Sequence, residues 1–303
     1  IDLPDNRPVG YYMNLQFTST GSHLAQGEGP WKMERNYRFV DGKSPKPLVF
    51  SVVNAGNIRE FVMTMSANAK LLWDFDQYDT DSFLDSFCAQ YFGTETAHDV
   101  AAAYRAFFYS YWQQKHPDMA GFDRQYIFQD MRYARAIEQI TRHFSNGYTP
   151  NPLVDKGFST PGQYFRIVPE DCGATNQLDA ILNGTESSIA KLRNVLTLCN
   201  NIYQKLPPAR RTFFNDNLRV QATFMLHLNE TLNAITRAFM TLQTGADKET
   251  ARFLDMADNS LTAARNALDE AEHGPFAHWY DGDSAFGIDN LHNRIQKARQ
   301  LVP

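Results

Sequence analysis

Two asparagines and a glycine follow an apolar stretch near the N-terminus. Residues 48–54 read LVFSVVN, and Ala55, Gly56 and Asn57 come directly after them. Carboxamide side chains both donate and accept hydrogen bonds, as contacts to sugar hydroxyls require. Functional residues of parallel β/α folds gather where strands end, so Asn54 and Asn57 are candidate contacts to a polar ligand. Asn57 is equally a candidate cap for the helix that follows.

Two further groups of polar residues have simpler explanations. Five aspartates lie in DFDQYDTDSFLD (74–85), which lacks the spacing and the glycine of an EF-hand calcium loop. A solvated linker with helix caps is the stronger interpretation. The segment HGPFAHWYDGD (273–283) holds two histidines and two aspartates but no helical His-x-x-x-His pair. We expect a turn there whose Trp279 and Tyr280 pack on the helices, and we predict neither a metal site nor a cofactor.

The composition argues against several classes of protein. The 303 residues carry a net charge of -5, whereas nucleic-acid binders present a concentrated basic face. No apolar run approaches the roughly 20 residues of a membrane-spanning helix. The motifs of P-loop NTPases, dinucleotide enzymes and serine hydrolases are absent. Cys88, Cys172 and Cys199 form no CxxC pair and leave the compartment open; a secreted or periplasmic location is our expectation.

The N-terminal quarter of the chain reads as two β/α units. Residues 9–18 and 48–54 are extended apolar stretches separated by a Gly/Pro-rich loop and a short polar segment. The second stretch is apolar without alternation, as in strands buried on both faces. Two strands cannot close a sheet, so either they pair only with each other or strands that precede them are missing. We expect the chain to be truncated relative to its gene.

The rest of the sequence reads as helices. Apolar residues recur at helical spacing after Asn57 and in a series of later segments: 83–92, 96–112, 122–144, 185–206, 207–242, 247–273 and 289–301. Long amphipathic helices joined by short loops are typical of antiparallel bundles. We therefore predict a mainly α protein, with a β/α segment at 1–75 and an antiparallel helical bundle at 76–303.

The order of these segments resembles glycoside hydrolase family 115. The resemblance is carried by four motifs: GYYMNLQF (10–17), GEGPWKM (27–33), LVFSVVNAGNIREF (48–61) and CAQYFG (88–93). The family comprises α-glucuronidases that act on xylan side chains. The resemblance implies that the β/α segment is the end of a (β/α)8 barrel, and that a helical bundle follows it.

Two positions depart from the family pattern. Met13 stands where the resemblance places a histidine, and Asn57 stands where it places an aspartate. An amide cannot act as an acid or a base, and glycoside hydrolysis generally uses two carboxyl groups across the scissile bond. The resemblance therefore implies that the catalytic acids lie on earlier strands, while Asn54, Asn57, Glu28 and Trp31 contact the substrate.

Three functions remain open at this point. We expect part of a glycoside hydrolase that binds an oligo- or polysaccharide. The alternatives are a non-catalytic helical carbohydrate-binding or interaction module, and an inactive homologue that binds a glycan without cleaving it. A polar cleft beside Asn54 favours an enzyme, whereas packed side chains there favour a module. Two copies could also pair as a homodimer through the helical domain.

Overall fold

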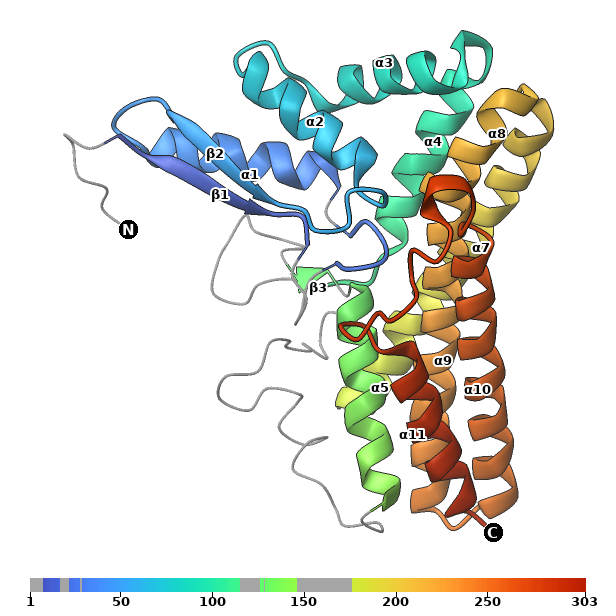
Figure 1. The fold of residues 1–303 in the computed structure, drawn as a ribbon. Coiled ribbons are helices and arrows are strands. Elements are labelled where there is room, and N and C mark those ends of the chain that lie inside the picture. The colour runs from blue at the N-terminus through green and yellow to red at the C-terminus, as the bar shows by residue number, and fades with distance from the viewer. Residues whose placement is uncertain (1–7, 17–21, 28, 115–125, 128, 146–175) are drawn as a thin grey trace.

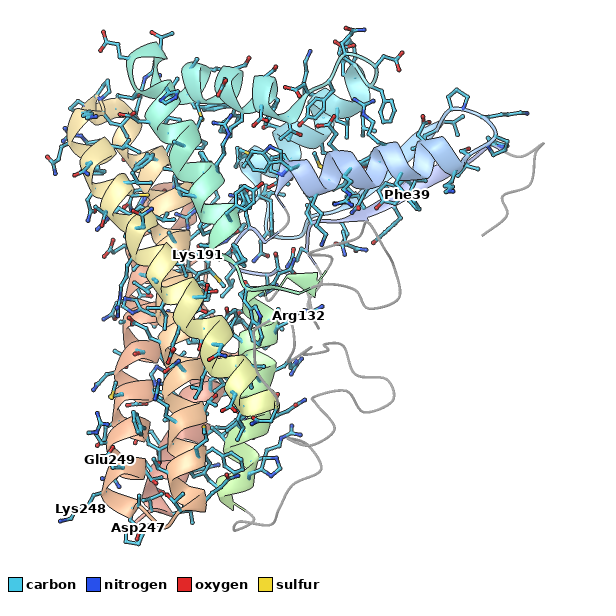
Figure 2. All side chains as sticks on the ribbon, turned by 180° about the vertical axis from the view of Figure 1, so that it is seen from behind. Phe39, Arg132, Lys191, Asp247, Lys248 and Glu249 are labelled. Atoms are coloured by element: carbon cyan, nitrogen blue, oxygen red, sulfur yellow. The ribbon has the colours of Figure 1, made fainter. Side chains whose placement is uncertain are left out.

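A small β/α layer lies beside one end of a long group of helices (Figure 1). The computed structural model describes residues 8–16, 22–27, 29–114, 126–127, 129–145 and 176–303. Seen from behind, Phe39 in the β/α layer and Asp247 in the helical part lie far apart, at different ends of the molecule (Figure 2). The predicted mainly α fold with a short N-terminal sheet is confirmed.

The elements follow one another from a strand–helix–strand unit into long helices. In chain order they are β1 (Gly10–Asn14), α1 (Pro30–Lys43), β2 (Phe50–Asn54), α2 (Val62–Trp73), α3 (Thr80–Phe92), α4 (Thr94–Ser110), β3 (Gln113–Gln114), β4 (Tyr126–Ile127), α5 (Asp130–Ser145), α7 (Gln177–Lys205), α8 (Pro208–Phe214), α9 (Val220–Gln243), α10 (Asp247–Asp269) and α11 (Ile288–Gln300). A π-helical turn, η2 (Asn215–Arg219), joins α8 to α9.

The sheet of β1 and β2 is parallel and buries one of its faces. Met13 packs with α1 and α2 in a compact apolar cluster. On the opposite face Tyr12 is 57% exposed, Phe50 is 60% exposed, and Val52 is also exposed. The prediction that the second strand is buried on both faces is therefore wrong for the described residues. Side chains alternate along a strand, and α1 and α2 cover only one side.

Helix α1 lies where the sequence analysis expected a short polar segment. Pro30 stands in its first turn, a favoured position for proline. Met33 and Tyr37 are one turn apart and fully buried, and they supply the narrow apolar stripe that packs on the sheet. Half of the other residues of the helix are charged, which hid the helical period in the sequence.

The long helices share one large apolar core around α9. This helix packs against α5, α7 and α10, and α11 packs on α5 and α10. The core also takes in Leu24 and Ala25, from the loop before α1, and Met63 from α2. The β/α layer and the helices are therefore joined by continuous apolar packing. No helix in the described residues is long and apolar enough to cross a membrane.

The cysteines that the structure describes behave as small buried apolar residues, as predicted. Cys88 and Cys199 are free thiols inside the core. Burial raises the pKa of each thiol to about 12, so neither is a reactive thiolate near neutral pH. Cys172 lies outside the described residues.

The core position of Leu228 in α9 gives a direct test of this packing. Its side chain is fully buried, so Leu228→Ala should lower the free energy of unfolding by about 2–5 kcal/mol. Met256→Ala in α10 is the control, because Met256 is 45% exposed and should change stability by less than about 0.5 kcal/mol. Urea unfolding monitored by circular dichroism measures both, and equal effects would contradict the assigned core.

Candidate functional site

Two asparagines lie side by side where the parallel strands end. The register sets Asn14 opposite Asn54, and the Asn54 Nδ2 donates a hydrogen bond of 3.0 Å to the Asn14 Oδ1. Asn14 is exposed and Asn54 is half-buried, so the pair is partly accessible to solvent. The sequence analysis named Asn54 but missed Asn14. The sequence feature that could have identified Asn14 is that each of the two strands ends in an asparagine.

The open face of the sheet changes from apolar to polar along the strands. At its start the Phe50 ring lies over Gly10, where an added Cβ would come within 2.4 Å of the ring. Tyr12 and Val52 pair in the middle, and the two asparagines pair at the end. The open face of this sheet therefore carries exposed aromatic surface at its start and paired amides at its carboxyl edge, where amides suit contacts to hydroxyl groups.

Asn57 holds the turn after β2 together instead of capping a helix. Helix α2 begins at Val62, so the interpretation of Asn57 as its cap is wrong. The Asn57 backbone N–H donates to the Gln16 Oε1 (2.8 Å), and its Nδ2 donates to the His23 backbone oxygen (2.9 Å). Gly56 is needed here, because a Cβ would lie 2.4 Å from the Gln16 Oε1. The Asn57 amide is thus largely engaged within the protein.

The loop that follows β1 is held by a buried carboxylate from α5. Asp130 accepts hydrogen bonds from the backbone N–H groups of His23 (2.9 Å), Leu24 (2.5 Å) and Ala25 (3.0 Å). Burial raises the pKa of the Asp130 carboxyl group to about 6, although these N–H groups favour its charged form. The loop is therefore fixed to the helical part close to the strand ends.

A second buried carboxyl group joins the turn after β2 to the loop before α11. The Glu60 Oε1 accepts hydrogen bonds from the Tyr280 hydroxyl (2.7 Å) and the Trp279 Nε1 (3.1 Å). Tyr280 also lies in the helical core, as the sequence analysis expected. Burial raises the pKa of Glu60 to about 7, and its Oε2 has no partner among the described residues.

The other two candidate residues do not join the strand-end pair. Trp31 lies against α3 and α4, where its Nε1 donates to the Asp81 Oδ1 (3.2 Å) and its ring meets Phe108 edge to face. Its contact with substrate stays a prediction. Glu28 lies outside the described residues.

The aspartates of residues 74–85 cap and pair helices. The Asp79 side chain accepts from the Ser82 backbone N–H (2.8 Å) and caps α3. Asp81 and Asp85 both pair with Arg105. Within the part of the chain that the structure describes, no group of three or more His, Cys, Asp or Glu side chains is placed to hold a metal ion.

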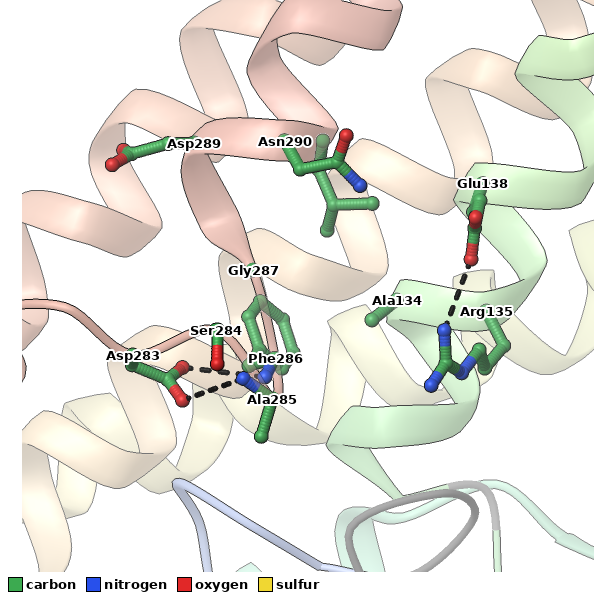
Figure 3. A pocket seen from close by; sticks show the side chains of 11 residues that line it. Ala134, Arg135, Glu138, Asp283, Ser284, Ala285, Phe286, Gly287, Asp289 and Asn290 are labelled. Carbon is green, nitrogen blue, oxygen red and sulfur yellow. Dashed lines mark hydrogen bonds and ion pairs between the residues drawn. The ribbon is translucent and has the colours of Figure 1, made fainter.

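A surface pocket of about 380 Å³ lies between α5 and the start of α11. Two of its carboxyl groups are engaged: Glu138 by Arg135, and Asp283 by the backbone N–H groups of Ala285 and Phe286 (Figure 3). Burial alone would raise the pKa values of Glu138 and Asp283. Hydrogen bonds outweigh burial, from Arg142 and Arg135 to Glu138 and from His23 to Asp283, so the pKa of each carboxyl group lies below its ordinary value. Neither group is suited to be a general acid.

The raised pKa of Glu60 predicts a distinct pH dependence of stability. A carboxyl group whose pKa is raised by folding stabilises the fold below about pH 4.5, and this contribution is lost as the pH rises through about 7. Glu60→Gln should therefore increase stability at about pH 8.5 by up to about 3 kcal/mol relative to its effect at about pH 4. Thermal or urea unfolding across this range tests it. A pH-independent difference would contradict the buried carboxyl group.

Two comparisons with known proteins found similar proteins. Residues 6–119 match the model of Glycosyl hydrolase family 115. No curated protein sequence matches the chain. The fold is similar to a solved structure described as a family GH115 4-O-methyl-alpha-glucuronidase, BtGH115A, with specificity for decorated arabinogalactans. The TM-score is 0.52 at 11% identity, and the match covers 96% of this chain but only 31% of that chain. The chain thus resembles glycoside hydrolase family 115, by sequence over residues 6–119 and by fold over nearly its whole length.

Proposed function

We propose that this chain forms the last β/α units of a (β/α)8 barrel and the adjoining antiparallel helical domain of an α-glucuronidase-like glycoside hydrolase. The open face of β1 and β2 carries the proposal. Tyr12, Phe50 and Val52 are large apolar residues that no described part of the chain covers. In a barrel, side chains of this kind fill the interior, and polar residues at the carboxyl ends of the strands meet the substrate.

The proposed role of the strand end is substrate contact. Asn14 and Asn54 present donors and acceptors at the polar end of the open face, and amides can orient sugar hydroxyls. Among the described residues no pair of carboxyl groups faces this edge, whereas hydrolysis generally needs two across the bond. The catalytic acid and base would therefore come from other strands.

The substrate class follows from the resemblance. Family 115 suggests glucuronic acid side chains of xylan, and the similar solved structure is described as specific for decorated arabinogalactans. Both are polysaccharides that carry uronic acid branches, so we take a uronic-acid-bearing plant polysaccharide as the ligand. The domain boundary at residue 75, the secreted or periplasmic location and a homodimer through the helices stay predictions.

An inactive homologue that binds a glycan is the second candidate, and Asn57 favours it. The Asn57 Nδ2 donates to the His23 carbonyl oxygen at 2.9 Å. An aspartate in its place would set a carboxylate against that oxygen and could not donate. The chain therefore uses this position as a structural amide, where the family resemblance places an acid.

The 303-residue chain alone should not hydrolyse glycosides. We expect no release of sugar from glucuronoxylan, arabinogalactan or aryl glycosides, because the strand end supplies amides and no opposed carboxyl pair. Reducing-sugar and chromogenic assays measure this. Robust turnover by the chain would overturn the assignment of the catalytic acids to other strands.

The two strand-end asparagines should respond differently to alanine. Asn54→Ala should weaken retention in native gels that contain glucuronoxylan, and should lower stability by only about 0.5–1.5 kcal/mol, because Asn54 is half-buried and its side chain donates to the exposed Asn14. Asn57→Ala leaves the His23 carbonyl without its donor and should cost about 1–3 kcal/mol. If Asn54→Ala is retained as strongly as the wild type, the hydrogen bond between Asn54 and Asn14 has a purely structural role.

A further inference from the structure

A chain of hydrogen bonds runs from the helical part of the molecule to the turn after β2. The His23 Nε2 lies 3.1 Å from the Asp283 Oδ1, and the His23 Nδ1 lies 2.6 Å from the Gln16 Nε2. The Gln16 Oε1 then accepts the Asn57 backbone N–H at 2.8 Å. Gln16 and His23 are buried, while Asp283 lies in the loop before α11. Four residues from three parts of the sequence thus meet in one line of contacts.

The direction of every bond in this chain is determined. A backbone N–H can only donate, so Gln16 must present its oxygen to Asn57 and its nitrogen to His23. The same Gln16 nitrogen also faces the Asn57 Oδ1 at 3.5 Å, which is consistent with that orientation. The His23 Nδ1 must then accept, so the ring proton lies on Nε2 and is donated to Asp283. One tautomer of His23 satisfies all of these contacts.

The chain reaches Asn54 as well as Asn57. The backbone N–H of Gln16 donates to the Asn54 carbonyl oxygen at 3.1 Å, and the Asn57 side chain donates back to the His23 carbonyl oxygen. Moving Gln16 would therefore disturb both asparagines. Asp283 lies 260 positions from His23 in the sequence, and its contact with the strand end runs through His23 and Gln16.

The carboxylates that surround His23 act on its charge. Burial lowers the pKa of His23, but the hydrogen bond to Asp283 and the charges of Asp130, Asp283 and Glu60 outweigh burial and raise it. The Gln16 amide works against protonation, because a proton on Nδ1 would face the Gln16 N–H groups. At a pH above the pKa of His23, the ring is therefore neutral with its proton on Nε2, and the whole chain of contacts is intact.

We propose that Asp283 is a positioning residue for the strand end, acting through His23 and Gln16. Asp283 accepts the Nε2 proton of His23, the His23 Nδ1 accepts from the Gln16 amide, and Gln16 holds the backbone of Asn54 and Asn57. The helical part thereby sets the geometry of the polar edge. The effect on glycan binding rests on the function proposed above, whereas the tautomer and the turn do not.

Two variants of the full chain test the positioning role by NMR at about pH 8. In the wild type the imidazole nitrogen shifts should show His23 protonated at Nε2. Asp283→Ala removes the acceptor of the His23 Nε2–H, so it should weaken this preference and speed amide exchange of Asn57 roughly tenfold as the Gln16 contact loosens. Asp281→Ala is the matched control in the same loop, since Asp281 is more exposed and pairs with His278. Equal exchange rates in the two variants would overturn the proposal.

Gln16→Glu distinguishes positioning from loss of folding. Its carboxylate still accepts the Asn57 N–H and can also accept a proton on Nδ1, so His23 should become doubly protonated while the protein stays folded. A His23 spectrum unchanged from wild type would contradict the chain of contacts, as would an Nδ1–H tautomer in the wild type.

Glycan binding is measured on the same variants in native gels containing soluble glucuronoxylan. Asp283→Ala should bind roughly fivefold to tenfold more weakly than Asp281→Ala. Loss of the His23 tautomer with unchanged glycan retention would support positioning of the turn and overturn the glycan contact. Absence of binding by the wild type would overturn the proposed function, and the NMR results would still decide the role of Asp283.

Discussion

Among the residues that the structure describes, the pair of parallel strands has packing partners on only one side of its sheet. Helices α1 and α2 both lie on the face that carries Met13, so the face with Tyr12, Phe50 and Val52 remains open within the described residues. A two-stranded sheet is marginal by itself, and here it depends on the helical core that receives Leu24, Ala25 and Met63. The open apolar face and the anchored loop together place two amides at an accessible polar edge.

Much of the fold follows from local patterns in the sequence, but the site does not. The apolar period located most of the helices, and Gly93 ends α3 with a positive φ, as a glycine after an aromatic stripe suggests. Helix α1 was not predicted, because only one narrow side of it is buried and its apolar period is weak. The pairing of Asn14 with Asn54 depends on strand register, and the contact of His23 with Asp283 joins positions 260 residues apart. Local periodicity carries no information about such contacts.

The departures from the family pattern have different meanings in the structure. Met13 packs in the core between the sheet and its helices, so this position does not face the open side. Asn57 uses its amide as a donor to a backbone oxygen, which a carboxylate could not do. The turn after β2 therefore holds a loop in place, and Asn14 and Asn54 are the amides for which we propose ligand contact.

Hydrogen–deuterium exchange of the chain with and without xylo-oligosaccharides that carry glucuronic acid tests the central claim most directly. If the strand end binds the glycan, protection should appear in residues 10–16 and 50–58, and α7, α9 and α10 should exchange unchanged. Protection confined to the helices, or to the pocket between α5 and α11, would place glycan binding elsewhere and contradict the account.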